Sequence, residues 1–337
     1  MAAVSHPRQS SVDLDSPDRP FDNIINFRDV GRSINRLVGR PILKEGILFR
    51  SARLDDASER DKRRLTDELH ISTVIDLRSS TEHQMATTKR RAELGDEDPA
   101  ASSSPADQHL VDLPGVRREL ISLTGKAFER TLLWKLDWWH FIKVLALAAS
   151  GYRPDAVLIV GEQVMSPRGL IGLGKDTLDS STAEMRAIFD LFAAGSEEPG
   201  NGLDGEDDED EEDEKAGSPP CNGDRPSTYP ILVHCTQGKD RTGLVILLLL
   251  LLTARVAEDA MRSDYVRSEP ELLVEVEERM KEIRLLGLSE DYTKCPDGFT
   301  TEIRRHLDEK YGGVEGYLRY VGMDEEKLER IRRTLLA

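Results

Sequence analysis

Two apolar runs joined by a short polar loop restrict the folds open to this chain more than any other segment. Residues 230–233 read Pro-Ile-Leu-Val, and residues 244–252 read Leu-Val-Ile followed by six leucines. Four apolar, partly β-branched residues are typical of a buried strand, and nine apolar residues without a polar face are typical of a fully buried helix. The sequence therefore predicts a strand, a loop and a helix at the centre of the fold.

Further predicted strands and helices alternate along the first two thirds of the chain. Strands are predicted at 47–51, 71–77 and 109–114, and helices at 58–69, 127–149 and 181–194. Residues 21–50 read as loop and strand with a turn at 37–41, and almost everything after residue 252 reads as helix. This order predicts an α/β fold with a central, mainly parallel sheet flanked by helices and a helical C-terminal third.

The helical pattern at 127–149 contains a cluster of large aromatic residues. Trp134, Trp138, Trp139 and Phe141 recur at helical spacing among aliphatic residues. Aromatic stripes on helices usually face the protein interior. We therefore expect this cluster to pack in the core, with a binding surface as the alternative.

Charge is distributed unevenly and suggests the domain organisation. The chain has a net charge of −17, and residues 196–217 hold twelve acids and one lysine, so this stretch contributes −11 and the remainder −6. We expect a disordered leader at 1–20 and a single domain over 21–337. Within that domain we expect an irregular insertion at about 86–107 and a disordered acidic insertion at about 196–228. The acidic insertion is interpreted as a solvated loop, with a docking or autoinhibitory role as the alternative.

The same composition bears on partners and location. A mildly acidic domain has no evident electrostatic reason to bind nucleic acid or an anionic membrane surface. Only Cys221, Cys235 and Cys295 occur, a sparse odd set that favours a reducing compartment over a disulfide framework.

Residues 1–20 lack an apolar signal core, and nine apolar residues at 244–252 are too few for the roughly 20 of a membrane span. We expect no transmembrane segment and a cytoplasmic protein, with the nucleus as an alternative.

The loop between the central strand and helix can hold and attack a phosphoryl group. Residues 234–243 read His-Cys-Thr-Gln-Gly-Lys-Asp-Arg-Thr-Gly. A helix N-terminus and nearby cations favour the thiolate that makes Cys235 a nucleophile. Successive loop N–H groups can surround one anion, and the Arg241 guanidinium can bind two of its oxygens. The predicted phosphate-binding residues are Thr236, Gln237, Gly238, Lys239, Asp240 and Arg241. The alternative is a buried structural cysteine.

Supporting roles are expected around these residues. Gly238 permits a tight backbone path, and Lys239 adds positive charge at the rim. Thr242 is placed to donate a hydrogen bond to the sulfur, and His234 to fix the loop through hydrogen bonds. No metal-ligand spacing stands out, so neither a metal nor another cofactor is expected.

The loop resembles the active-site loop of the cysteine-dependent protein tyrosine phosphatase superfamily. Its Gly-Lys-Asp-Arg-Thr-Gly form is similar to the branch that includes a mycobacterial secreted tyrosine and phosphoinositide phosphatase and fungal relatives. Segments 26–31, 48–54, 74–82, 264–268 and 311–322 also resemble motifs of that branch. The resemblance covers most of 21–337 and thins over about 86–228.

The resemblance implies a phosphatase that hydrolyses phosphate monoesters through a phosphocysteine intermediate. Protein phosphotyrosine is the first expected substrate, and a phosphoinositide or inositol phosphate the second. A catalytically silent phosphate-binding module is the rival from another class, but Cys235 and Arg241 are both intact. The oligomeric state is not readable from the sequence.

The proton donor is the least defined part of this hypothesis. No Trp-Pro-Asp segment occurs, and the resemblance implies Asp240 as the general acid. Asp112, Asp176 and Asp179 are the alternatives. Arg50 and Arg78 follow predicted strands, where they could bind substrate or form structural ion pairs. The helical region 270–296 could form a lid or a plain structural helix.

Overall fold

The computed structural model describes residues 21–94, 109–194 and 228–337. The predicted leader at 1–20 lies outside the described residues. So do Cys221, residues 95–107 of the first predicted insertion and nearly all of the acidic one, 196–227.

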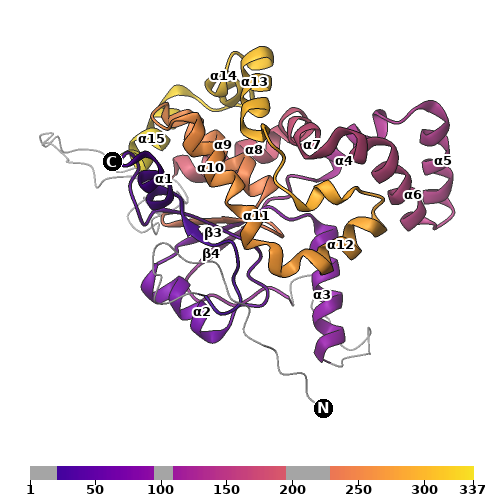
Figure 1. Ribbon diagram of the computed structural model, residues 1–337, viewed down its shortest axis with the longest axis horizontal. Helices are drawn as coiled ribbons and strands as arrows, with labels where there is room; N and C mark the ends of the chain where they lie inside the picture. Colours follow the sequence, from indigo (N-terminus) through magenta and orange to yellow (C-terminus); the bar gives the residue numbers. More distant parts are fainter. Residues whose placement is uncertain (1–20, 95–108, 195–227) are drawn as a thin grey trace, which may run out of the picture.

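A five-stranded sheet forms the centre of the molecule, in the order β1-β2-β5-β3-β4. The strands are β1 (Arg28–Asp29), β2 (Leu48–Ser51), β3 (Thr73–Asp76), β4 (Arg117–Leu120) and β5 (Ile231–His234). The last four run parallel, and β1 pairs antiparallel with β2. Helices flank this sheet (Figure 1), which confirms the predicted fold class.

The helices account for most of the remaining described residues. They are α1 (Val30–Val38), α2 (Glu59–Arg63), α3 (Ser80–Leu94), α4 (Lys126–Trp134), α5 (Trp138–Ala149), α6 (Arg153–Val160), α7 (Ser166–Ser180), α8 (Thr182–Ala193), α9 (Asp240–Thr253), α10 (Glu258–Val266), α11 (Ser268–Glu271), α12 (Val276–Leu285), α13 (Phe299–Tyr311), α14 (Val314–Tyr320) and α15 (Glu325–Leu335). Helices α13 and α14 lie at the top of Figure 1, and α15 lies beside α9. The predicted helical C-terminal third is therefore confirmed.

Strand β5 and helix α9 are buried, as their apolar sequences predict. All four residues of β5 are buried, and Ile231 and Val233 join the large core that contains α9. Leu232, on the opposite face of the sheet, packs with Phe27 and Phe49 in a second cluster. Because parallel strands end at one edge, the residues that follow β2, β3 and β5 are brought together there.

The predictions for three other segments were wrong in whole or part. Residues 30–38 form α1, where Asp29 caps the N-terminus and Gly39 ends the helix with a φ of 74°. The strand expected at 109–114 is irregular, and the edge strand is instead β4, whose Arg-Arg-Glu-Leu sequence carries no apolar pattern because an edge strand is partly solvated. Residues 86–94 are part of α3 and not irregular.

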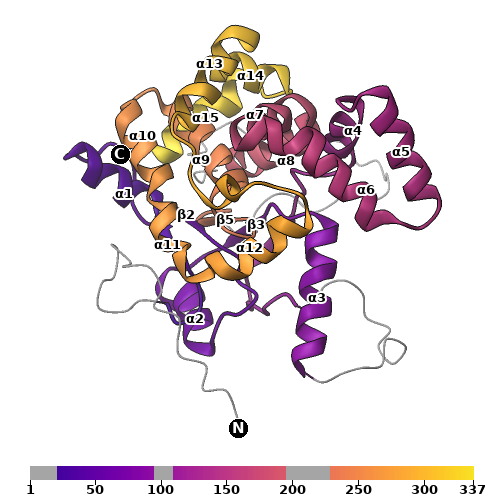
Figure 2. The same cartoon turned by 45° about the vertical axis from the view of Figure 1, so that its right-hand side comes forward.

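The tryptophan cluster is exposed, so the expected core packing was wrong. Trp134, Trp138 and Trp139 are 74%, 69% and 80% exposed. Helices α5 and α6 form a hairpin that projects from the body of the molecule (Figure 2).

One helical segment bears on the expected absence of a membrane span. Among the described residues, Arg153–Ser180 is long and apolar enough to cross a membrane by length and composition, and 22% of its most apolar window is buried. The helix is interrupted at Gly169, whose φ of 59° and ψ of −177° are not helical. It is therefore a kinked segment that begins on the exposed hairpin and ends against the core.

Candidate active site

The loop from Cys235 to Lys239 connects β5 to α9 at the carboxyl edge of the sheet. Cys235 is only 3% exposed. Gly238 has a φ of 65°, and a Cβ added there would lie 2.0 Å from the Ser51 carbonyl oxygen. Both the left-handed backbone and the close approach require glycine at this position.

The backbone of this loop is arranged to bind an anion. The carbonyl of Thr236 accepts a hydrogen bond from the Arg53 N–H, and that of Gln237 accepts one from the Asn26 side chain at 2.8 Å. The carbonyl of Gly238 accepts one from the Arg50 guanidinium, also at 2.8 Å. Within the described part of the chain, no group accepts a hydrogen bond from the N–H groups of residues 236–241. These N–H groups are thus left for a ligand at the N-terminus of α9.

Arg241 is held in place by Glu82, a residue to which sequence reasoning assigned no role. Both terminal nitrogens of Arg241 donate to the Glu82 carboxylate at 2.6 Å, and Glu82 also accepts from the Thr236 hydroxyl at 2.5 Å. Burial raises the pKa of Glu82, but the charge and hydrogen bonds of Arg241 outweigh it and leave the pKa well below its ordinary value. The carboxylate is therefore ionised and fixes the guanidinium in one orientation.

Cys235, Asp240 and Arg241 share one electrostatic environment. Burial by itself lowers the pKa of Arg241. The negative charge of Glu82 raises this pKa by more, and Cys235 and Asp240 add smaller upward effects, so the pKa lies above its ordinary value. Asp240 is the first residue of α9, and its carboxylate accepts a hydrogen bond from the Tyr265 hydroxyl at 3.2 Å. The structure thus brings the predicted nucleophile, phosphate ligand and proton donor together.

The alternative proton donors lie elsewhere. Asp176 is paired with Arg168 at 2.6 Å, and Asp179 binds His306 at 2.8 Å. Asp112 is exposed on the loop that precedes β4. Asp240 is therefore the candidate that best fits the site.

A buried ion-pair network supports the loop on the β2 side. Arg50 is 1% exposed and binds Asp264 at 2.6 Å. Arg28 binds the same carboxylate at 2.8 Å. Arg50 also donates to the Gly238 carbonyl, so its role is structural.

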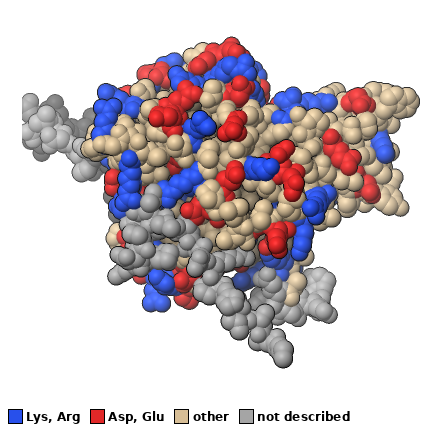
Figure 3. Space-filling model, viewed as in Figure 1, with Lys and Arg blue, Asp and Glu red and all other residues tan. Residues whose placement is uncertain are grey.

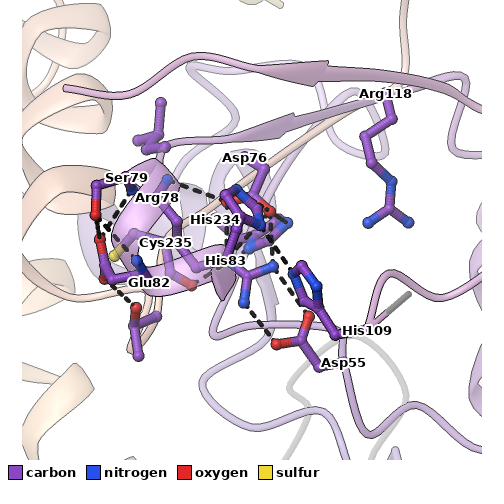
Figure 4. Close-up of polar contacts among 12 residues, drawn as sticks. Asp55, Asp76, Arg78, Ser79, Glu82, His83, His109, Arg118, His234 and Cys235 are labelled. Atoms are coloured by element: carbon purple, nitrogen blue, oxygen red, sulfur yellow. Dashed lines mark hydrogen bonds and ion pairs between the residues drawn. The ribbon is translucent and has the colours of Figure 1, made fainter. Parts of the chain in front are cut away.

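A second network lies on the β3 side (Figure 4). Arg78 pairs with Asp76 at 2.8 Å and with Asp55 at 2.6 Å, which makes it structural as well. His234 is fully buried with its Nε2 atom 3.6 Å from Asp76, and burial lowers its pKa to about 4. A neutral His234 therefore supports the loop from the end of β5 and does not act as an acid.

Two supporting residues differ from their predicted roles. Lys239 is fully buried, and its ammonium group donates to the carbonyls of Tyr292 and Lys294 at 3.1 and 2.6 Å, so it ties the loop to the chain at 290–294 and adds no charge at the rim. The buried Thr242 hydroxyl has no hydrogen-bond partner among the described residues, so the expected bond to the Cys235 sulfur is not formed.

The mouth of the site is covered by the 3₁₀ turn Leu273–Glu275 and by α12. A cavity of about 10 Å³ remains beside the loop, room for about one water molecule. It is lined by Arg53, Thr236, Gln237, Glu275, Glu278, Arg279 and Glu282. Glu275 binds the Arg53 guanidinium through both oxygens, at 2.8 and 3.0 Å. This segment thus lies over the loop, where the lid interpretation of 270–296 expects it, and a second cavity of about 630 Å³ between this segment and 290–294 also reaches Gln237.

Among the described residues, no three His, Cys, Asp or Glu side chains are arranged to hold a metal ion. The loop and its neighbours present a thiol, a guanidinium, carboxylates and free backbone amides.

A model of the tyrosine phosphatase family matches residues 19–136 and 222–337. These ranges hold β1 to β5, the Cys235 loop and every helix after it. The chain belongs to the tyrosine phosphatase family. Within the described residues, the unmatched stretch 137–221 holds α5 to α8.

Two curated proteins are similar to parts of this chain. A triple specificity protein phosphatase, PtpB, of Mycobacterium tuberculosis is 33% identical over 122 residues, which are 32% of this chain and 44% of that protein. A tyrosine-protein phosphatase of Nostoc commune is 31% identical over 115 residues, which are 30% of this chain and 37% of that protein. The chain thus spans less than half the length of either relative.

Proposed function

We propose that this protein is a cysteine-dependent phosphatase that hydrolyses phosphate monoesters, with protein phosphotyrosine as its substrate. The observation that carries the proposal is the set of unpartnered loop N–H groups between Cys235 and Arg241, with Arg241 fixed by Glu82. A nucleophile beside a preformed anion site is the arrangement that phosphoryl transfer requires.

The proposed reaction has two displacement steps. The Cys235 thiolate forms a bond to phosphorus while the ester bond breaks, and the departing oxygen takes a proton from Asp240. Water then attacks phosphorus, the sulfur–phosphorus bond breaks, and Asp240 regains a proton from that water. The loop amides and Arg241 hold the three remaining oxygens in both steps.

Phosphotyrosine remains the first substrate, and a phosphoinositide or inositol phosphate the second. The description of the mycobacterial relative as a triple specificity protein phosphatase supports action on phosphoproteins and allows a broader range. In the closed arrangement Lys239 is buried against carbonyls of 290–294, so it offers no charge there to a second phosphate group of a polyanionic headgroup.

The direct test is hydrolysis of p-nitrophenyl phosphate by wild-type protein and by Cys235→Ser. The variant should lose at least about 10³-fold in kcat, because serine is a far weaker nucleophile at this position. Turnover should be insensitive to a chelator and inhibited by vanadate. Cys295→Ser is the matched control, since Cys295 is also buried but lies outside the loop, and it should keep its turnover.

Two outcomes would contradict the proposal. Near-normal turnover by Cys235→Ser would exclude a phosphocysteine. Vanadate binding without turnover in the wild type would identify a silent phosphate-binding module. A panel of phosphotyrosine peptides and phosphoinositides then ranks the two substrate classes by kcat/KM.

A further inference from the structure

The α5–α6 hairpin presents a large apolar surface that the phosphatase site does not use. All three tryptophans of the chain lie on or beside it. Tyr152 at the turn is 60% exposed. The other large exposed apolar residues here are Ile142, Leu145 and Val157, at 42%, 47% and 46%. Tan surface predominates over this lobe, at the right of Figure 3.

Helix α5 is unusual for a helix surrounded by water. Ten of its twelve residues are apolar, and His140 and Lys143 are the two exceptions. Only Val144 is buried, because α5 packs almost entirely against α6. A helix that is apolar nearly all round is ordinarily buried in a core or in a membrane. Beside α6, the described residues give it one ring contact, the stacking of Phe141 on Trp134 of α4 with ring centroids 5.9 Å apart.

The exposed area is at the upper limit for an ordinary monomer surface. The three tryptophans alone expose on the order of 500 Å², since each such side chain offers about 150–250 Å². The largest apolar patch on a typical monomer is about 300–600 Å² and often functional. The aliphatic residues of the hairpin extend this area further.

The geometry of the exposed face distinguishes between possible occupants. At about 100° per residue, the exposed positions of α5 extend over about 220° of its circumference. A partner helix covers a stripe of roughly 100°, so a second copy of the hairpin would leave much of this face in water. A lipid phase surrounds the whole exposed arc at once.

Charge and residue type also fit a phospholipid surface. Residues 126–160 hold five basic and three acidic residues, a net charge of +2 in a chain of −17. Trp and Tyr are the residues that concentrate at the boundary between headgroups and acyl chains. Lys143 lies within the apolar arc, where its long side chain can reach the headgroups.

The hairpin is suited to lie on a membrane and not to span it. Helix α5 has twelve residues, against the roughly 20 of a span. The longer segment that starts at α6 is interrupted at Gly169, and beyond this kink Asp176 is buried in an ion pair with Arg168. The second half of the segment therefore belongs to the folded core.

We propose that the α5–α6 hairpin is a membrane-docking element that inserts its tryptophan face into the interface of an anionic phospholipid bilayer. The element lies outside the residues that match the tyrosine phosphatase family. The proposal is independent of the catalytic reaction, and its test measures binding only.

The experiment is flotation of the full chain with vesicles of equimolar phosphatidylcholine and phosphatidylserine. The wild type should float with the vesicles, and Trp138→Ser combined with Trp139→Ser should lower the partition coefficient at least about tenfold. Met85→Ser combined with Tyr320→Ser is the matched control, because these residues are 61% and 63% exposed on other helices. This control should float like the wild type.

Intrinsic fluorescence gives a second measurement that needs no variant. All three tryptophans report on the hairpin, so vesicles should shift their emission to shorter wavelength, and brominated phosphatidylcholine should quench it. Wild-type protein that stays at the bottom of the gradient without quenching would overturn the proposal. So would equal flotation by the tryptophan variant, or a dimer in light scattering that the tryptophan substitutions dissociate and that does not bind vesicles.

Discussion

One carboxylate determines the orientation of Arg241, the proposed phosphate ligand. Glu82 uses both oxygens to hold the two terminal nitrogens of Arg241, and a third hydrogen bond ties Glu82 to Thr236 inside the loop. The pair is partly buried, with exposed side-chain fractions of 28% for Glu82 and 18% for Arg241. Fixing the guanidinium before the substrate arrives reduces the ordering that binding would otherwise require.

Replacement of Glu82 by glutamine should therefore impair catalysis without removing any reacting group. We expect Glu82→Gln to lower kcat for p-nitrophenyl phosphate by about 10- to 100-fold and to weaken vanadate inhibition, because an amide cannot hold both nitrogens as acceptor. Glu59→Gln, an exposed change on α2, is the control. Unchanged kcat and unchanged vanadate inhibition in Glu82→Gln would show that Arg241 is oriented by other groups.

At the residue scale, the sequence identified the residues that make up the loop but not their contacts with distant parts of the chain. Cys235, Asp240 and Arg241 lie close together because one short loop and the first turn of α9 contain all three. The burial of Lys239 could not be predicted, since it depends on where residues 290–294 pack against the loop.

The cover over the active site is made of short helical pieces. The first part of the predicted helical region 270–296 is broken into α11, a 3₁₀ turn at Leu273–Glu275 and α12. Glu275 lies at this break and reaches Arg53 on the other side of the mouth. The Glu275 side chain is only 7% exposed and the Arg53 side chain 17%. This partly buried ion pair therefore stabilises the closed arrangement, in which the segment 270–285 lies over the loop.

Loss of this ion pair should make the site easier to open. We expect Glu275→Gln to raise kcat/KM for a phosphotyrosine peptide by about fivefold, since about 1 kcal/mol would no longer favour the closed state. Amide hydrogen exchange in 268–285 should become faster. Glu278→Gln removes the same charge from the same cover and breaks an exposed pair with Lys89, so it should have little effect. A similar gain in both variants would attribute the effect to charge alone.

The predictions of strands and helices were right where the burial of an element agreed with its hydrophobic pattern, and wrong where burial and pattern differed. Strands β2, β3 and β5 and helix α9 are apolar and buried, so pattern and environment agree. Strand β4 is polar because it lies at the sheet edge, and α5 is apolar although it is exposed. In both cases the hydrophobic pattern depends on a neighbour that the local sequence does not reveal.

At the scale of the whole molecule, buried histidines behind the loop make the stability depend on pH. Burial lowers the pKa of His234 to about 4, from an ordinary 6.5, and lowers the pKa of His83 and His109 as well. Below pH 6.5 these histidines bind protons in the unfolded chain but stay neutral in the folded protein. Stability should therefore be complete above pH 6.5 and fall between there and about pH 4.

The measurement is urea unfolding across that pH range. His234 alone should contribute a loss of about 3 kcal/mol, and His234→Asn should show a correspondingly shallower fall. The carboxylates Asp76 and Glu82, whose pKa values are lowered, add a further loss in the same direction at lower pH. An equally steep fall in His234→Asn would refute the assignment to this histidine.

The sequence alone determined which residues make up the loop between β5 and α9 and predicted the α/β class, because both are encoded within short runs of neighbouring residues. Tertiary structure alone decided which groups act on that loop. Glu82 meets Arg241 from 159 residues away, and Lys239 turns inward to carbonyls more than 50 residues later. It also left the tryptophans on the surface, although their spacing predicts a core. Burial and long-range pairing arise from the packing of distant elements, which local periodicity does not specify.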